Sequence, residues 1–503
     1  MAIPSPPRQD AARGSIACSD GTHLPSREGN GAISTRTTAG IDFARPHWQL
    51  GRLDAHAQAA LVHKGEVSPV ELVHAAFARI EELDPALGAV SYRAFDHALR
   101  AAERVDHALP IAGVPLLLKA STSYPGFPHV CGSRSRRSDV ATTLHPFAAA
   151  LDAAGLIACG MTTMPELGLM GSGEAVIYGP TRNPWDLGRS PGGSSSGSGA
   201  AVAAGLVPFA TGSDGGGSIR LPAAHCGIVG FKPSRGWNLR ARASTLVDDL
   251  FACDSLMART MRDTGWAARY LRSQPVRQAA RPKALRIGLN LIGLDGRAPQ
   301  PEVAAATRAA GALCASLGHT VEECPLPIDH PAMRRAFEVI WVYGAGEAAD
   351  VVRARYPDKP IETLLEPWTL GLAAMRDEVS PEELADTLTQ FERLHRQMAP
   401  HWQRFDLVLS PVADSAAPPI GVLDPTRDFP ALAHDHFGHV NFTHLQNMGG
   451  FPAISLPLGR SAAGLPIGAM FWGPHGADDL LLDLGETLEA AVDWRDRWPP
   501  LVR

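Results

Sequence analysis

The sequence predicts an α/β fold in which helices cover a layer of buried strands, and three observations support this prediction. Short apolar runs alternate with helix-like stretches between about residues 110 and 240. Two capping boxes mark the starts of helices on either side of this region. Hydrophobic residues make up 45% and charged residues 19% of the 503 residues, which is a globular composition with ample material for a core.

The strands are predicted from the apolar runs, because a strand buried on both faces is continuously hydrophobic. In chain order the runs are VPLLL (114–118), GLIACG (155–160), GLVPFA (205–210), GIVGF (227–231), DLVLSPV (406–412), PAISLPL (452–458) and LPIGAMF (465–471).

The helices are predicted from caps and periodicity. Ser68-Pro69-Val70-Glu71 is a capping box with proline at the first helical position, and apolar residues follow at helical spacing, which predicts a helix over 69–83. A second capping box lies at Ser380-Pro381-Glu382-Glu383. Residues 301–320 and 330–405 are helix-rich, and 478–491 read as an amphipathic terminal helix.

The chain is expected to form one large domain after a tail. Residues 1–46 mix Ser, Gly, Pro and Thr without hydrophobic periodicity, which predicts a disordered N-terminal tail. No repeat or linker divides residues 47–503. Within them, 110–240 is the expected catalytic core, and 330–405 is an expected helix-rich insertion that forms a substrate pocket.

Charge and hydropathy argue against several classes of partner. The net charge of −6 and the lack of a basic stripe argue against a nucleic-acid partner. The longest uncharged stretch, 190–213, holds an apolar part of about a dozen residues, too short to span a bilayer. The seven cysteines are scattered and odd in number, which favours reduced thiols. We therefore expect a cytoplasmic protein without a membrane anchor, and a homodimer is one assembly compatible with the sequence.

Three segments carry potential chemistry. Lys119 ends a hydrophobic strand, where a lysine either extends its ammonium to solvent or is buried, with a lowered pKa that makes it a general base. The segment PGGSSSGSGAAVAAG (191–205) runs from glycines and serines into an uncharged helix, and it contains a GxSxG match centred on Ser195, the pattern of a hydrolase nucleophile elbow. In TGSDGGGSIRLP (211–222), glycines precede a serine at a predicted helix start, which suits either an anion-binding turn or a nucleophile beside oxyanion-binding amides.

Together these segments resemble the amidase signature family. The pattern GGSSSG…GSDGGGSIR…GIVGFKP is long and specific, and PTRNPWD (180–186), LVLSPV (407–412) and GGFPAISLPLG (449–459) extend the resemblance over about residues 48–495. It implies a large mixed β-sheet core covered by helices on both sides. The run NPWDLGRSPGGSSSGSGAAVAAG looks most like the nylon-oligomer (aminohexanoate cyclic-dimer) hydrolase and bacterial amidase branch.

The resemblance also implies the site. It assigns the catalytic lysine to Lys119, the bridging serine, which follows a cis peptide bond, to Ser194, and the nucleophile to Ser218. It assigns the oxyanion hole to the amides of Gly215, Gly216, Gly217 and Ser218. No metal or organic cofactor is expected, because a serine, a neutral lysine and backbone amides suffice for acyl transfer.

The expected function is hydrolysis of a small-molecule amide through an acyl-enzyme. Nylon-type oligomers, aryl acylamides and carbamates are the candidate substrates. Two alternatives stay open: the A-type subunit of a tRNA-dependent amidotransferase, and a non-catalytic scaffold with the same fold. The sequence departs from the family at Ala120, where aspartate is usual, and at Met161, where lysine is common, and the segment 121–130 is atypical, so substrate choice stays open.

Other residues have two interpretations. His434, His436, His439 and His444 crowd one stretch, which suits pocket or solvent-facing histidines better than a metal site, since no cysteine or ligand-spaced carboxylate pair accompanies them. Asp214 and Arg220 flank the predicted nucleophile, and we expect a structural pair that holds the loop. Four aromatic residues of the insertion line an apolar acyl pocket or pack in an ordinary core: Phe337, Trp341, Tyr343 and Trp368.

Overall fold

The computed structural model describes residues 42–239, 250–273 and 284–502, and these belong to one compact unit. The predicted tail, apart from residues 42–46, lies outside the described residues. The first helix, α1, spans Pro46–Gly51 and buries Trp48, close to where order was expected to begin.

The first sheet holds three strands of the predicted catalytic core, β2, β3 and β6. It mixes parallel and antiparallel pairs, and its spatial order is β1 (Val90–Arg93), β3 (Ile157–Thr162), β2 (Pro115–Lys119), β6 (Phe209–Asp214) and β8 (Cys253–Met257). Of these, β2 pairs in parallel with both β3 and β6. The carboxyl ends of β2 and β6 therefore meet at the same edge of the sheet.

The second sheet is built mainly from the C-terminal half. Its order is β10 (Thr320–Glu323), β9 (Arg286–Leu289), β11 (Leu407–Pro411), β13 (Pro466–Trp472), β12 (Ala453–Arg460) and β7 (Gly230–Lys232). The two sheets are joined by an isolated bridge between Val229 and Ala258. The mixed α/β class is confirmed, but the described strands form two large sheets and one two-stranded sheet instead of the single large sheet that the resemblance implies. The reason is that β7 has three residues and pairs with β12. It lies beside β8, where Lys232 Nζ contacts Cys253 Sγ at 3.8 Å, but the described residues of β7 form no ladder with β8.

Helices cover both faces of the first sheet, as the alternation along β2 shows. Leu117 packs with α3 (Pro69–Leu87) and α6 (Ser196–Ala203). Its neighbours Leu116 and Leu118 pack on the opposite face. The helices on that face are α2 (Ala55–His63), α5 (Pro146–Ala153) and α9 (Met261–Tyr270). Successive side chains of a strand point to opposite faces, so a strand covered on both sides is apolar throughout.

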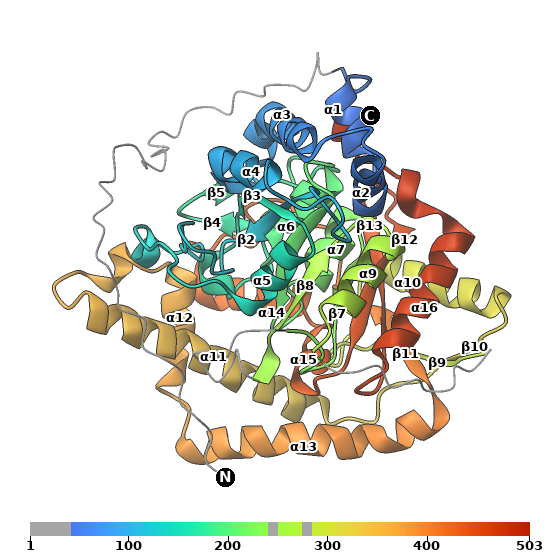
Figure 1. Ribbon diagram of the computed structural model, residues 1–503. Coiled ribbons are helices and arrows are strands. Elements are labelled where there is room, and N and C mark those ends of the chain that lie inside the picture. The colour runs from blue at the N-terminus through green and yellow to red at the C-terminus, as the bar shows by residue number, and fades with distance from the viewer. Residues whose placement is uncertain (1–41, 240–249, 274–283, 503) are drawn as a thin grey trace, which may run out of the picture. The chain divides into compact units, whose positions relative to one another are not determined.

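The second sheet is also covered on both faces. One face packs on α10 (Pro301–Ser316), α9 and α16 (Asp478–Val492). The other face packs on α7 (Arg220–Cys226), α11 (His330–Arg355), α13 (Pro381–Arg404) and α15 (His444–Met448). Figure 1 shows α11 and α13 running side by side along the edge of this core. Further α-helices of the described residues are α4 (Phe95–Ala102), α12 (Pro367–Arg376) and α14 (Phe429–His439).

The strand predicted at 205–210 begins later than expected. Gly205 follows α6 and has φ +71°, a left-handed conformation that turns the chain instead of extending it. A Cβ at this position would also contact the Trp498 ring. Pro208 follows without a backbone N–H, and β6 starts at Phe209. The shift places Asp214 at the end of β6, directly before the glycine-rich loop.

The first capping box is present in full and the second in part. At α3, the Ser68 hydroxyl accepts from the Glu71 amide while the Glu71 carboxylate accepts from the Ser68 amide. At α13, Ser380 caps the Glu383 amide, but the Glu383 carboxylate accepts from Nε of Arg335, 2.6 Å away on α11. Only the Ser380 half of the second capping box is therefore confirmed. The Glu383 carboxylate forms an ion pair with Arg335 of α11 instead of completing the box.

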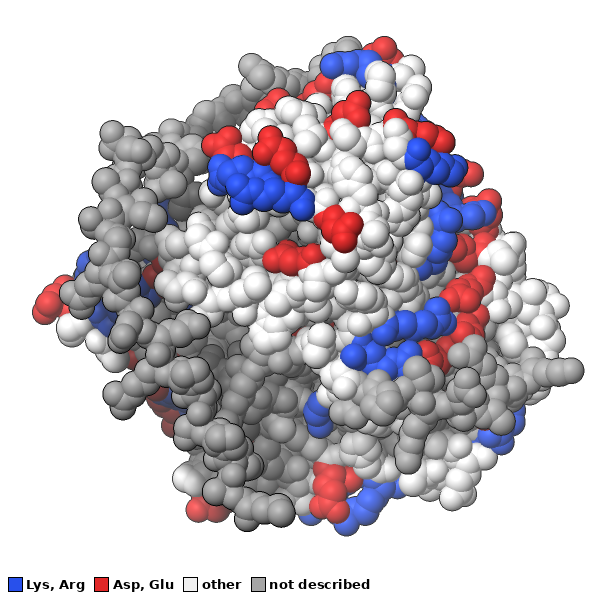
Figure 2. Space-filling model, viewed as in Figure 1, with Lys and Arg blue, Asp and Glu red and all other residues white. Residues whose placement is uncertain are grey.

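Charges of both signs are interspersed on the face of the molecule that Figure 2 shows. Opposite charges of the described residues also form networks, such as the one around Arg269, which pairs with Asp479, Asp483 and Glu486. Among the described residues, no helix combines the length and apolarity needed to cross a membrane.

Glu174, in the short hairpin of β4 (Glu174–Ala175) and β5 (Gly179–Pro180), is a buried carboxyl that links two loops. Its Oε2 accepts from the Gly421 amide at 2.8 Å, and the residue is 5% exposed. Burial, with a smaller contribution from Asp424, raises the pKa of Glu174 from 4.5 to about 7, although the Gly421 amide acts in the opposite direction.

We expect Glu174→Gln to stabilise the protein increasingly as the pH rises from 4.5 to about 7. In the unfolded chain the carboxyl ionises near 4.5, whereas in the folded chain it keeps its proton until about 7, so the wild-type protein loses stability across this window and the neutral variant does not. The difference in unfolding free energy should grow by about 1–3 kcal/mol, measured by urea denaturation at several pH values. A constant difference across the window would contradict the raised pKa.

Candidate active site

Lys119 lies at the carboxyl end of β2 and is 1% exposed. Its Nζ donates to the Ser194 hydroxyl at 2.8 Å and to the Ser213 hydroxyl at 2.9 Å. Its backbone amide donates to Thr211 Oγ1 at 2.7 Å on the neighbouring strand β6. Of the two interpretations of Lys119, the structure supports the buried lysine that contacts a serine.

Ser194 lies two residues before α6, and the Gly193–Ser194 peptide bond is cis, as the resemblance implies. The serine is 2% exposed. A Cβ on Gly193 would collide with the backbone oxygen of Ser172, so only glycine fits this approach. The neighbouring Ser195, the centre of the GxSxG match, is fully buried and donates weakly to the Ser213 carbonyl at 3.4 Å.

Ser213 is a contact of the lysine that the sequence motifs did not reveal. Thr211 and Ser213 are two residues apart on β6, so their side chains lie on one face of the strand. Thr211 accepts from the backbone amide of Lys119, and Ser213 accepts from the Lys119 Nζ. The alternating hydroxyls in TGSD next to a parallel strand were the signal that could have identified this contact.

The glycine-rich loop follows β6 directly. Gly217 has φ +125°, a conformation that favours glycine, and its amide donates to Asp214 Oδ1 at 2.8 Å. Within the described residues, the amides of Gly215, Gly216 and Ser218 form no hydrogen bond. The loop therefore presents three of the four predicted oxyanion-binding amides, while the fourth, that of Gly217, is already engaged.

Asp214 and Arg220 form the buried pair that was expected to hold this loop, and both side chains are fully buried. The Asp214 carboxylate accepts from Arg220 Nη2 at 2.8 Å and Nε at 2.9 Å. Burial alone would raise the pKa of Asp214, but the Arg220 guanidinium holds it well below its usual range. Asn447 of α15 adds donors to the Asp214 carboxylate at 3.0 Å and to its carbonyl at 2.9 Å. The Asp214 carboxylate is therefore ionised near pH 7, and these hydrogen bonds hold the start of the loop.

Ser218 lies two residues before α7 and keeps 7% exposure. Its carbonyl accepts from the Ser195 amide at 3.2 Å, which joins the loop of the predicted nucleophile to the loop of the bridging serine. Its hydroxyl forms no hydrogen bond with any residue that the structure describes. The structure thus brings Lys119 and Ser194 into contact and places Ser218 on the adjoining loop with an unengaged hydroxyl.

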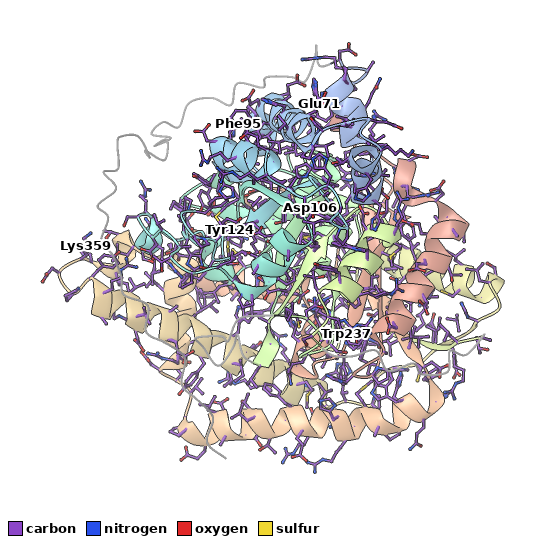
Figure 3. All side chains as sticks on the ribbon, in the orientation of Figure 1. Glu71, Phe95, Asp106, Tyr124, Trp237 and Lys359 are labelled. Atoms are coloured by element: carbon purple, nitrogen blue, oxygen red, sulfur yellow. The ribbon has the colours of Figure 1, made fainter. Side chains whose placement is uncertain are left out.

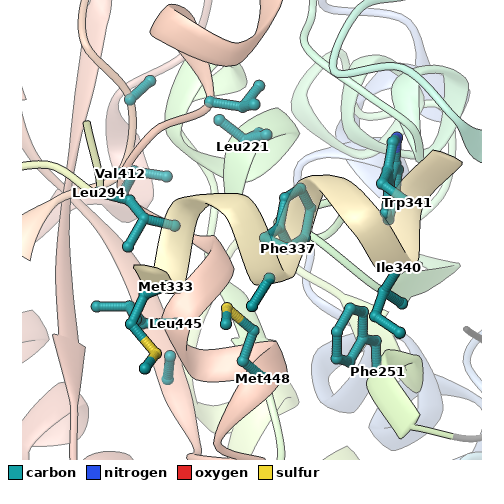
Figure 4. Packing of buried hydrophobic residues seen from close by; sticks show 14 of the residues in the cluster. Leu221, Phe251, Leu294, Met333, Phe337, Ile340, Trp341, Val412, Leu445 and Met448 are labelled. Carbon is teal, nitrogen blue, oxygen red and sulfur yellow. The ribbon is translucent and has the colours of Figure 1, made fainter. Parts of the chain in front are cut away.

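The aromatic residues of the insertion border this loop. A Cβ on Gly216 would lie 3.2 Å from Phe337 Cζ and 3.5 Å from the Trp341 ring. The Phe337 ring stacks on His444 at 3.6 Å and on Trp341 at 5.2 Å between centroids. Figure 4 shows Phe337 and Trp341 projecting from α11 among Leu221 and other buried residues. Both interpretations therefore apply to these two rings, which are core residues that also border the glycine loop.

The other two residues of that aromatic set are Trp368 and Tyr343. Trp368 is 1% exposed, and its indole donates to the Leu169 carbonyl at 3.1 Å, as that of Trp341 does at 3.3 Å. Tyr343 is half-buried. The indoles therefore connect the insertion to residues 166–170, where Gly168 approaches Ser194.

The histidine-rich stretch divides into one exposed and three buried side chains. His434 is exposed, whereas His436, His439 and His444 are at most 7% exposed. Burial lowers the pKa of His436 to about 3 and that of His439 to about 4, and it lowers the pKa of His444 well below its usual range. These three imidazoles are neutral near pH 7. Among the described residues, no group of three or more His, Cys, Asp or Glu side chains is arranged to hold a metal ion.

The atypical segment after Lys119 is linked to neighbouring elements by side-chain hydrogen bonds. Ala120 is buried, and Tyr124, labelled in Figure 3, donates to the Asp152 carboxylate of α5 at 3.0 Å. Burial, followed by the Asp152 charge, raises the pKa of Tyr124 well above its usual range, so the phenol stays protonated. Met161, where lysine is common in the family, packs in the core of the first sheet.

Comparison with known proteins gives consistent similarities along the chain. A family model described as Amidase matches residues 71–482. The chain is 34% identical to a 6-aminohexanoate-cyclic-dimer hydrolase of Pseudomonas sp. (strain NK87), covering 90% of this chain and 97% of that protein. It is 31% identical to the A-type subunit of the glutamyl-tRNA(Gln) amidotransferase from Symbiobacterium thermophilum, covering 87% and 96%. A solved structure of 6-aminohexanoate cyclic dimer hydrolase with substrate has a TM-score of 0.83 at 31% identity, covering 90% of this chain and all of that one.

Proposed function

Since the chain belongs to the amidase signature family and is an amide-hydrolysing enzyme, we propose that it cleaves its substrate with Ser218 as nucleophile, Lys119 as general base and Ser194 as the bridge between them. The observation that carries this proposal is the 2.8 Å hydrogen bond from Lys119 Nζ to Ser194 Oγ beside the loop of Ser218. A serine hydroxyl needs a base to become nucleophilic, and a neutral lysine acting through a second hydroxyl can supply one.

The proposed reaction moves one proton along this chain of groups. Ser218 Oγ attacks the carbonyl carbon and gives its proton to Ser194, which gives its own to neutral Lys119. Collapse of the tetrahedral intermediate breaks the C–N bond, and the proton returns through Ser194 to the departing amine. Water then attacks the acyl-enzyme by the same route and releases the acid and free Ser218.

The oxyanion of the intermediate is proposed to bind the amides of Gly215, Gly216 and Ser218. These are the amides of the loop that have no hydrogen bond within the described residues. The Gly217 amide, which the resemblance also implied, donates to Asp214, so we assign it to holding the loop. Preorganised amides of this kind are usually the largest contribution to acyl-transfer catalysis.

The proposed substrate is a small-molecule amide, with no nucleic acid or membrane partner, and the proposed location is the cytoplasm. The similarity to relatives named as cyclic-dimer hydrolases favours nylon-type oligomers as substrates. Aryl acylamides and carbamates are the other two candidate substrate classes. Hydrolysis of the three classes, measured side by side as kcat/KM, tests the substrate assignment. Labelling of Ser218 by a fluorophosphonate, located by peptide mass spectrometry, tests the nucleophile and would exclude a non-catalytic scaffold.

The A-type amidotransferase component is a second candidate, supported by the 31% identity to one such protein. It predicts little amidase activity in the isolated chain and co-purification with partner subunits. An isolated chain that hydrolyses small amides at rates typical of enzymes would exclude it.

We expect Ser194→Ala to lower kcat/KM about 10²-fold, at the lower end of the range for a proton-transfer group, because a water molecule can occupy part of the vacated space. The measurement is the rate of acylation by substrate and by fluorophosphonate, with the melting temperature as a check on folding. Ser196→Ala is a matched control, since that buried hydroxyl at the first residue of α6 donates to the Thr163 carbonyl at 3.3 Å. Equal rates in the two variants would mean that Lys119 reaches Ser218 without Ser194.

A further inference from the structure

The carbonyl groups of the glycine loop are held by donors outside it. The Gly216 carbonyl accepts from the Thr443 hydroxyl at 2.6 Å. The Gly217 carbonyl accepts from the Leu221 amide at 2.8 Å, and the Ser218 carbonyl accepts from the Ser195 amide at 3.2 Å. Of these donors, Thr443 alone is a side chain, and it comes from the segment that leads into α15.

The peptide group between Gly216 and Gly217 is fixed at both ends. Its carbonyl accepts from Thr443, and its amide donates to Asp214 Oδ1 at 2.8 Å. Since the C=O and N–H of one peptide point in opposite directions, these two bonds together set the rotation of the peptide plane. That rotation in turn fixes ψ of Gly216 and φ of Gly217, and so fixes the directions of the amides on either side.

The surroundings of Thr443 favour this contact. Its side chain is fully buried, and it lies so close to Gly217 that a Cβ on this glycine would collide with it. The hydroxyl has one proton and two neighbouring carbonyls, Gly216 at 2.6 Å and Val440 at 3.2 Å. The shorter distance identifies Gly216 as the acceptor.

We propose that Thr443 is a positioning residue, whose hydroxyl holds the Gly216–Gly217 peptide so that the amides of Gly215, Gly216 and Ser218 converge on the oxyanion. This inference rests on the proposed function, in which those amides bind the oxyanion. Without the hydroxyl, the Gly216 carbonyl would be buried without a donor, and the glycine-rich backbone is free to rotate toward another one. A rotated peptide would misalign the neighbouring amides.

The test compares Thr443→Val, which keeps the shape and removes the hydroxyl, with Thr443→Ser, which keeps the hydroxyl. We expect the valine variant to lose about 10- to 100-fold in kcat with KM changed less than about threefold, since a misplacement of about 1 Å costs up to about 10²-fold and the amides act in the transition state. The serine variant should retain most of the rate. Thr307→Val is the control, because its buried hydroxyl donates to the Val303 carbonyl at 2.8 Å within α10, far from the loop in sequence.

The outcomes separate this inference from the function on which it rests. If the wild-type enzyme neither hydrolyses amides nor labels at Ser218, the proposed function fails, and the assignment of Thr443 fails with it. If the wild-type enzyme is active and Thr443→Val matches Thr443→Ser, only the positioning role is overturned. Equal losses in both variants, or a rise in KM alone, also overturn it, because they indicate packing or substrate binding. Should the valine variant fail to fold, Thr443→Ala is compared with Thr443→Ser by the same criteria.

Discussion

Replacement of Ser218 by alanine is expected to abolish turnover, with a loss on the order of 10⁶-fold in kcat, the size found when a serine protease loses its nucleophile. The physical reason is that no other group can form the ester bond of the acyl-enzyme. The variant should fold normally, since the Ser218 hydroxyl has no hydrogen bond with any described residue. The measurement is single-turnover hydrolysis together with fluorophosphonate labelling, which should disappear completely.

Ser195→Ala is the matched control for this experiment. Ser195 is the adjacent candidate from the GxSxG pattern, but it is fully buried and contacts the Ser213 carbonyl at 3.4 Å. It should keep its labelling and most of its rate. Labelling that survives in Ser218→Ala but is lost in Ser195→Ala would instead identify Ser195 as the nucleophile and refute the proposed mechanism.

Loss of the Lys119 amine is expected to have the second-largest effect. Lys119→Ala should lower kcat/KM by about 10²–10⁴-fold, the usual range for a positioned acid–base group. Lys119→Arg should be nearly as damaging, because a guanidinium stays protonated and cannot accept the proton of Ser194. A lysine that only pairs with neighbours or packs predicts the reverse, with arginine preserving much of the rate.

The pH dependence and rescue of these variants decide between the two roles of Lys119. A base must be neutral in the free enzyme, so wild-type kcat/KM should rise with pH, and this rise should be absent in Lys119→Ala. Titration of His436 or His439 cannot explain a rise of kcat/KM near pH 7, since burial lowers their pKa values to about 3 and about 4. Small primary amines added to Lys119→Ala should restore part of the rate. Substantial activity of Lys119→Arg with an unchanged profile would rule out the general base.

The sequence predicted the parts of the fold that have local signatures. The apolar runs became β2, β3, β7, β11, β12 and β13 within a few residues, because a strand buried on both faces needs unbroken hydrophobicity. The strands β1, β4, β5, β8, β9 and β10 were missed. None is longer than five residues, and β1 and β10 have exposed or half-buried residues, so their patterns are too short or too polar to stand out.

The candidate site was predictable where motif and chemistry coincide, at Lys119, Ser194 and Ser218. The structure places these residues on adjoining segments, and their roles stay proposals. The contacts of Thr443 and Asn447 were not predictable from local patterns. They lie 227 residues from Gly216 and 233 residues from Asp214, and a single sequence carries no local signal for contacts at such a separation.

That separation has a consequence for biosynthesis. During synthesis, the strand with Lys119 and the loops with Ser194 and Ser218 leave the ribosome before the segment 443–447 has been made. Until α15 docks, the Gly216 carbonyl lacks the Thr443 hydroxyl and Asp214 lacks the Asn447 amide. Until then, the proposed nucleophile Ser218 lies in a loop that lacks two of the hydrogen bonds that hold it in the folded protein.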